Sequence, residues 1–135
     1  MFLIDKEKNE AISINKKTFQ ELEFKERQHL QEWISKNTGI LGENLLIIQK
    51  EFSGFDDTKE RLDLLAIDEN GNLVIIENKL DDSGRDVVWQ ALKYASYCSS
   101  LTKNDIKDIF QKYLDLQGNG DYAEKLICEF LEIED

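Results

Sequence analysis

The segment DENGN at 68–72 constrains the fold more than any other feature, because it is the strongest hairpin signal in the chain. Its Asn-Gly pair tolerates the positive φ angles that a tight hairpin turn requires. Apolar runs flank it at 61–68 and 73–79, so the sequence predicts two antiparallel strands there. A turn centred on Asn-Gly pairs residues whose numbers add to about 141, which places Asp63 opposite Asn78 to within about two residues.

The remaining elements follow from the periodicity of apolar residues. Two short strands are expected at 2–4 and 11–14, then a helix over about 25–36 and a strand over 45–52. Three amphipathic helices are expected after the hairpin, from Ser83 or Asp86 to about 99, over 103–116 and over 121–133. This order predicts an α/β or mixed α+β class, with a small mixed sheet flanked by helices.

The charge balance narrows the partners that the chain can bind. Its 135 residues suffice for one domain, and a hydrophobic content of 41% allows a real core. Acidic residues number 28 and basic residues 17, which gives a net charge of −11. Such a charge argues against a bulk electrostatic binder of DNA or membranes, but it leaves room for a local acidic site that recruits a metal ion.

Residue types also narrow the chemistry and the compartment. Cys98 and Cys128 lie far apart without a CxxC pattern, so we expect both to be reduced. A single histidine, His29, argues against a histidine zinc site or a Ser-His-Asp triad, so carboxylates and lysine must carry any chemistry. The chain has no apolar run of about 18 residues and no signal peptide, so we expect a cytoplasmic protein without membrane contact.

Charged residues gather at the end of the predicted hairpin. Side chains alternate along a strand, so Glu77 and Lys79 project from one face, roughly 7 Å apart. Leu73 and Ile75 precede them on that face, and Asp63 on the neighbouring strand lies within reach of Glu77. Two carboxylates beside an ammonium suit Mg²⁺, which takes oxygen ligands from carboxylates, waters and substrate phosphate. A surface ion pair is the structural alternative.

The pattern of these residues resembles the PD-(D/E)XK nuclease superfamily. Members carry an Asp on one hairpin strand and Glu-x-Lys on the next, as Asp63 and the segment 77–79 do here. The following helix carries Gln90 and Tyr94, which match the Q-x-x-x-Y pattern of RecB-type nucleases. Upstream, Glu26 matches the acidic residue that many members place on their first helix.

The resemblance covers residues 26–97, and this run is similar to the endonuclease domain of NucS-like proteins. Three positions depart from the family pattern. Leu62 precedes Asp63 where some members have Pro. Asn78 stands where the family usually has an apolar residue. Glu26 lies four residues before Leu30 rather than three, which leaves Glu32 as the alternative for the acidic position on the first helix.

The resemblance implies a restriction-endonuclease-like core that binds Mg²⁺, for which Mn²⁺ substitutes. The implied metal ligands are Asp63, Glu77 and the backbone carbonyl of Asn78. Lys79 would position the attacking water, and Glu26 would complete the acidic shell. Gln90 and Tyr94 would support the site, so we expect their side chains to face the segment 77–79 rather than solvent.

The function implied by the resemblance is Mg²⁺-dependent hydrolysis of DNA phosphodiester bonds, in DNA repair or in restriction and defence. The alternative is a catalytically inactive nuclease-fold module that binds nucleic acid or a protein partner, which the net charge of −11 favours. A homodimer or a C-terminal partner domain would supply the missing basic surface. We expect an appended hairpin at 1–17, a nuclease core at 18–101 and helices of the same domain at 102–135, with the chain as the N-terminal domain of a longer protein.

Overall fold

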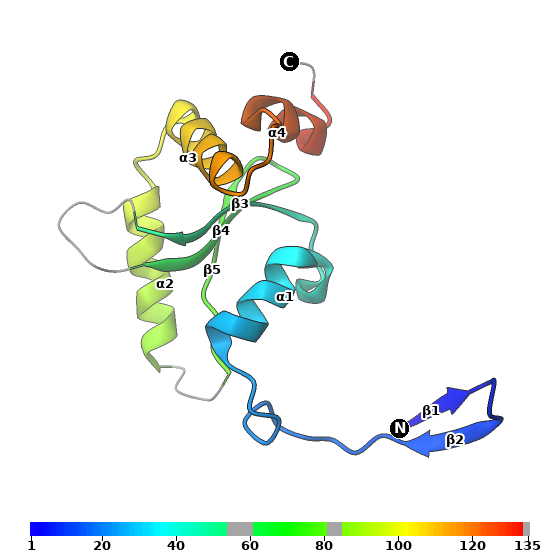
Figure 1. The fold of residues 1–135 in the computed structure, drawn as a ribbon. Helices are drawn as coiled ribbons and strands as arrows, with labels where there is room; N and C mark the ends of the chain where they lie inside the picture. The colour runs from blue at the N-terminus through cyan, green and yellow to red at the C-terminus, as the bar shows by residue number, and fades with distance from the viewer. Residues whose placement is uncertain (54–60, 81–84, 134–135) are drawn as a thin grey trace.

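A computed structural model describes residues 1–53, 61–80 and 85–133 as a mixed α+β fold (Figure 1). Its strands are β1 (Phe2–Asp5), β2 (Glu10–Ser13), β3 (Leu45–Phe52), β4 (Leu62–Asp68) and β5 (Leu73–Ile76). Its helices are the π-helical η1 (Glu26–Leu30), α1 (Gln31–Lys36), the 3-10 helix η2 (Thr38–Leu41), α2 (Arg85–Cys98), α3 (Lys103–Leu116) and α4 (Ala123–Leu131).

The predicted hairpin forms the centre of the fold. Strands β3, β4 and β5 make a three-stranded sheet in that order, and the turn between β4 and β5 falls on the DENGN segment. The Asp68 carboxylate accepts hydrogen bonds from the backbone N–H groups of Asn70 (2.9 Å) and Asn72 (2.8 Å). Gly71 has a φ of +78°, the left-handed conformation that explains a glycine at this position.

The sheet is antiparallel throughout the described strands, and the prediction of a mixed sheet is therefore wrong. The connections explain the difference. Nine residues join β3 to β4 and four join β4 to β5. A parallel pair needs a crossover of about a dozen residues or more, so connections of this length favour antiparallel neighbours.

Both faces of the sheet are covered, and each face buries alternate residues of β4. One face packs Leu65 and Ile67 against Tyr94 of α2 and Phe110 of α3. The opposite face packs Leu64 and Ala66 against the α1 region, where Ile34 is buried. Figure 1 shows α1 and α2 on opposite sides of the sheet. Alternate residues of β4 are therefore buried on opposite faces, which leaves the strand ends as the place for polar side chains.

The C-terminal helices close the core beyond the sheet. Helix α3 begins at a capping box, in which Thr102 Oγ1 accepts from the Asp105 N–H at 3.2 Å and Asp105 Oδ2 accepts from the Thr102 N–H at 2.8 Å. Cys98 is buried and Cys128 is half-buried, and neither forms a disulfide within the described part of the chain. None of the helices in the described part of the chain is long and apolar enough to cross a membrane. The predicted cap Ser83 lies outside the described residues.

The expected strands near the start pair as an antiparallel hairpin, β1 with β2, which extends away from the rest of the fold (Figure 1). Its apolar side chains face solvent, and Phe2, for example, is 65% exposed. All residues from 1 to 23 except Asp5 are exposed. The hairpin therefore buries almost nothing of the body of the protein.

Deleting residues 2–14 should change the free energy of unfolding by less than about 0.5 kcal/mol, because the deletion removes no buried contact. Thermal melts of the full chain and of the deletion variant, at several protein concentrations, measure the difference. A melting temperature lowered by about 5 °C or more would show that the hairpin packs against the body or stabilises an assembly.

Candidate active site

The predicted acidic pair lies where β4 and β5 meet, just beyond the last backbone pair of the ladder. The Asp63 N–H donates to Glu77 Oε1 at 3.3 Å, and the Asn78 N–H donates to Asp63 Oδ2 at 2.9 Å. Each carboxylate thus binds the backbone of the opposite strand. Since Leu64 pairs with Ile76, the register places Asp63 level with Glu77, one residue from the position predicted by the turn.

Strand β5 ends at Ile76, three residues before the predicted end at Lys79. The cause is the Asp63 side chain, which takes the Asn78 N–H as a hydrogen-bond donor. The segment 77–79 therefore continues β5 in sequence but is held by side chains rather than by a backbone ladder. This exchange fixes the Asp63 and Glu77 carboxylates at one point of the sheet.

Both carboxylates carry an electrostatic penalty in this position. Burial raises the pKa of Asp63, and the Asn78 N–H and the Lys79 ammonium offset part of the rise. Burial and repulsion by Asp63 raise the pKa of Glu77 to about 7, against partial compensation by the Asp63 N–H and by Lys79. Two half-buried carboxylates that repel one another are a favourable place for a cation.

Lys79 forms a long ion pair with Glu26. Its Nζ lies 3.8 Å from Glu26 Oε2, and Glu26 Oε1 accepts a hydrogen bond from the Leu80 N–H at 3.1 Å. Glu26 therefore anchors the backbone that follows Lys79 as well as its side chain. Glu32, the alternative for this acidic position, forms an ion pair with Lys50 at 2.7 Å instead.

Glu26 lies at the start of a π-helical turn. Residues 26–30 form η1, in which the Leu30 N–H donates to the Lys25 carbonyl at 3.3 Å. Such a turn holds one residue more than an α-helical turn, so it shifts the side chains that precede it. His29 Nδ1 accepts from the Lys25 N–H at 2.9 Å, so this histidine helps to cap the turn.

Gln90 and Tyr94 share one face of α2 and point toward the start of β4. Tyr94 is only 1% exposed, and its hydroxyl donates to the Arg61 carbonyl at 3.0 Å. Gln90 is half-buried, and its Nε2 donates to the Tyr94 hydroxyl at 3.4 Å. The pair thus fixes the backbone two residues before Asp63. Neither side chain is exposed to solvent, as expected, and the expectation that they face the segment 77–79 stays a prediction.

Tyr94→Phe should lower the free energy of unfolding by about 1 kcal/mol, because the Arg61 carbonyl loses its hydroxyl donor while the ring stays packed. Chemical denaturation of both proteins measures the change. Tyr122→Phe is the matched control, since Tyr122 is 73% exposed and should leave stability unchanged. Equal losses in the two variants would contradict a supporting role for the Tyr94 hydroxyl.

Asn78, between Glu77 and Lys79, turns its side chain into the protein. It is 3% exposed, and its Nδ2 is buried without a hydrogen-bond partner. A buried amide of this kind destabilises a fold, by about 1 to 3 kcal/mol. An apolar side chain at this position would avoid this cost. The ligand role of the Asn78 carbonyl remains a prediction.

One ionic cluster beside the site has no signal in the sequence. Glu51 Oε1 forms an ion pair with Arg27 Nε at 2.7 Å, and Glu51 Oε2 forms one with Arg61 Nη1 at 3.3 Å. Arg27 also offsets part of the rise in the pKa of Asp63, so its charge reaches the acidic pair. The three residues come from η1, β3 and the residue before β4, and only the folded sheet brings them together.

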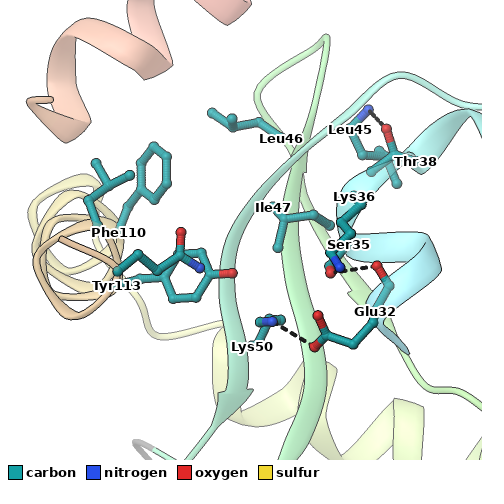
Figure 2. Close-up of a pocket in the computed structure, with 12 residues that line it drawn as sticks. Glu32, Ser35, Lys36, Thr38, Leu45, Leu46, Ile47, Lys50, Phe110 and Tyr113 are labelled. Carbon is teal, nitrogen blue, oxygen red and sulfur yellow. Dashed lines mark hydrogen bonds and ion pairs between the residues drawn. The ribbon is translucent and has the colours of Figure 1, made fainter. Parts of the chain in front are cut away.

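A separate cavity of about 470 Å³ lies between α1, β3 and α3 (Figure 2). Tyr113 and Phe110 line one side, and the ion pair of Lys50 with Glu32 lines the other. The hydrogen bond from Lys50 to Glu32 raises the pKa of the lysine. Lys50 and Glu32 also line a second pocket, together with Arg27 and Glu51.

The donor set at Asp63 and Glu77 fits a hard cation with few protein ligands. Within the described residues, no group of three or more His, Cys, Asp or Glu side chains is arranged to hold a metal ion. Mg²⁺ needs only one or two protein carboxylates when waters and substrate phosphate complete its octahedron. Two half-buried carboxylates whose charge Lys79 compensates only in part match that requirement.

Comparisons of the chain with models of protein families, with curated proteins and with solved structures find no match. The site itself must therefore carry the functional argument.

Proposed function

We propose that the protein is a Mg²⁺-dependent nuclease with a restriction-endonuclease-like core that hydrolyses phosphodiester bonds of DNA, in repair or in defence. The proposal rests on one observation. Asp63 and Glu77 exchange hydrogen bonds with each other's strands at the end of the β4–β5 hairpin, and Lys79 follows on the same segment. Each carboxylate is half-buried, and Glu77 has a pKa raised to about 7. Perturbed groups of this kind cluster at functional sites.

Asp63, Glu77 and the backbone carbonyl of Asn78 would hold the ion, which when bound supplies Lewis-acid stabilisation of charge on the phosphate and a more acidic water. The Lys79 ammonium orients the attacking water and offsets negative charge that develops on the phosphate. Glu26 Oε2 lies 3.8 Å from Lys79 Nζ and would help to hold the ammonium in place. In the reaction, the water oxygen bonds to phosphorus and the bond from phosphorus to the 3′ oxygen breaks, so the products are a 3′-hydroxyl and a 5′-phosphate.

A supporting layer would keep these groups in place. Tyr94 holds the Arg61 carbonyl at 3.0 Å, and Gln90 donates to the Tyr94 hydroxyl. Neither side chain needs to touch the substrate for this role. Buried contacts of this kind contribute to catalysis because they hold the ligands within fractions of an ångström of the correct position.

The second candidate is a catalytically inactive module of the same architecture that binds nucleic acid or a protein partner. The exposed apolar hairpin favours a protein partner, since Phe2, Leu3 and Ile4 are more than half exposed. An isolated two-stranded hairpin is only marginally stable in water, so a partner that covers it would stabilise it. The net charge of −11 also favours a protein partner, because it repels nucleic acid.

Cleavage of DNA separates the two candidates. Supercoiled plasmid and single-stranded DNA are incubated with the protein and Mg²⁺ or Mn²⁺, and the termini are mapped. The nuclease predicts nicking that leaves 5′-phosphates and is lost in the near-isosteric variant Asp63→Asn. A folded wild-type protein that cleaves neither substrate with either ion would refute the nuclease and favour the binding module.

A further inference from the structure

The ionic cluster of Arg27, Glu51 and Arg61 lies beside the candidate active site and is built unlike an ordinary surface ion pair. Glu51 uses both carboxylate oxygens, one for each arginine, at 2.7 and 3.3 Å. The Arg27 and Arg61 side chains are 64% and 56% exposed, so both guanidinium groups remain accessible. The carboxylate thus lies between two cations that solvent can reach.

The position of Glu51 in β3 places this cluster next to Asp63. Its neighbours Lys50 and Phe52 pair with Leu64 and Leu62, the residues on either side of Asp63. Glu51 itself has a φ of +51°, a left-handed conformation inside a strand that side chains rarely adopt. Strained residues of this kind persist where the surrounding structure enforces them, and they cluster at ligand-binding sites.

We propose that Arg27 and Arg61 form a clamp for a backbone phosphate of the DNA, and that the Glu51 carboxylate occupies this clamp when no substrate is bound. The planar guanidinium fork binds carboxylate and phosphate in the same way, so a phosphodiester can replace Glu51 without new geometry. The inference deepens the proposed nuclease function, because it names the residues that bring the phosphate to Asp63.

The clamp resolves the conflict between an acidic chain and an anionic substrate. With 28 acidic and 17 basic residues, the surface as a whole repels DNA. A pair of arginines that is already assembled beside the acidic pair supplies positive charge at the one point where the substrate must approach. Glu51 offsets one of the two positive charges in the free protein and is displaced by a phosphate of the same charge.

Binding of a fluorescent 20-nucleotide single-stranded DNA, measured by anisotropy in EDTA across a range of salt, tests the clamp without any cleavage. Replacing both arginines, Arg27→Ala with Arg61→Ala, should weaken binding by about 10- to 100-fold and reduce the salt slope by about 0.7, the contribution of one neutralised phosphate of a single strand. Glu51→Gln should strengthen binding by about 3- to 10-fold, because the competing charge is gone.

Matched controls separate the clamp from general charge effects. Glu129→Gln and Lys125→Ala alter an exposed ion pair on α4, 3.7 Å across, and should leave affinity nearly unchanged. Thermal melts confirm that each variant is folded. When both arginines are replaced, Glu51→Gln should no longer strengthen DNA binding, because the variant then has no arginine clamp to release.

Three results would overturn the clamp: no binding by the wild-type protein at low salt, unchanged affinity and salt slope in the double arginine variant, or equal gains from Glu51→Gln and Glu129→Gln. The cleavage test stays independent of these results. Arginine-dependent binding without cleavage would refute the nuclease and keep the clamp. Cleavage with arginine-independent binding would refute the clamp alone.

Discussion

Lys79→Ala should reduce Mg²⁺-dependent DNA cleavage by about 10²- to 10³-fold, the usual effect of removing one group that stabilises charge in a transition state. Folding should be almost unaffected. Lys79 lies beyond the end of β5, its side chain is one-third exposed, and its ion pair with Glu26 is long at 3.8 Å. Truncation therefore opens no sizeable cavity and should cost about 1 kcal/mol or less.

Initial rates of plasmid nicking and thermal melts of the same preparations measure the two effects. Lys125→Ala is the matched control, because it also removes a lysine from a glutamate partner, Glu129, at 3.7 Å, but on α4. We expect this control to retain cleavage. Equal rates for Lys79→Ala and the wild-type protein would remove Lys79 from the mechanism.

Glu77→Gln should stabilise the metal-free protein at pH 8 while it abolishes stabilisation by Mg²⁺. The pKa of Glu77 is raised to about 7 in the folded state, above the ordinary value of 4.5. Between these values the folded protein binds the proton more tightly than the unfolded chain does. Stability therefore falls as the pH rises from about 4.5 to 7, and above pH 7 the full penalty is present.

Glutamine carries no charge and escapes this penalty. Because the site is partly open to solvent, we expect a gain of about 1 to 2 kcal/mol at pH 8 and little difference at pH 4. The wild-type protein should regain stability when Mg²⁺ is added, since a ligand of the folded state stabilises it by mass action. Glu77→Gln should gain almost nothing from the ion.

Chemical denaturation at pH 4 and pH 8, with EDTA and with Mg²⁺, tests both statements. Glu32→Gln is the control, because this glutamate forms the ion pair with Lys50 and should lose rather than gain stability when neutralised. A lower stability of Glu77→Gln than of the wild-type protein in EDTA at pH 8 would show that Glu77 does not carry an uncompensated charge.

Local signals predicted most of the fold. Strand β3 covers Leu45–Phe52 and helix α3 covers Lys103–Leu116, both as expected from apolar periodicity. The turn at 68–72 could be predicted because its chemistry lies within five neighbouring residues. The predicted hairpin register placed Asp63 near Glu77 and Lys79. The resemblance to a nuclease family added Glu26 to this group.

The features that sequence reasoning missed depend on contacts between distant segments. The early end of β5 follows from a hydrogen bond to the Asp63 side chain, which no propensity encodes. Tyr94 reaches the Arg61 carbonyl, 33 positions away, so its direction depends on how α2 packs. The cluster around Glu51 likewise joins three separate segments, and its positive φ leaves no trace in the residue type.

A crystal soaked in Mn²⁺ tests whether Asp63 and Glu77 share a cation, as the proposed nuclease requires. Anomalous diffraction near the manganese edge locates the ion without reference to activity. We expect a single strong anomalous peak in contact with one carboxylate oxygen of each residue. This peak should be absent from crystals of Asp63→Asn. Crystals that bind no manganese between these carboxylates at millimolar concentration, or that bind it only elsewhere, would contradict a shared cation.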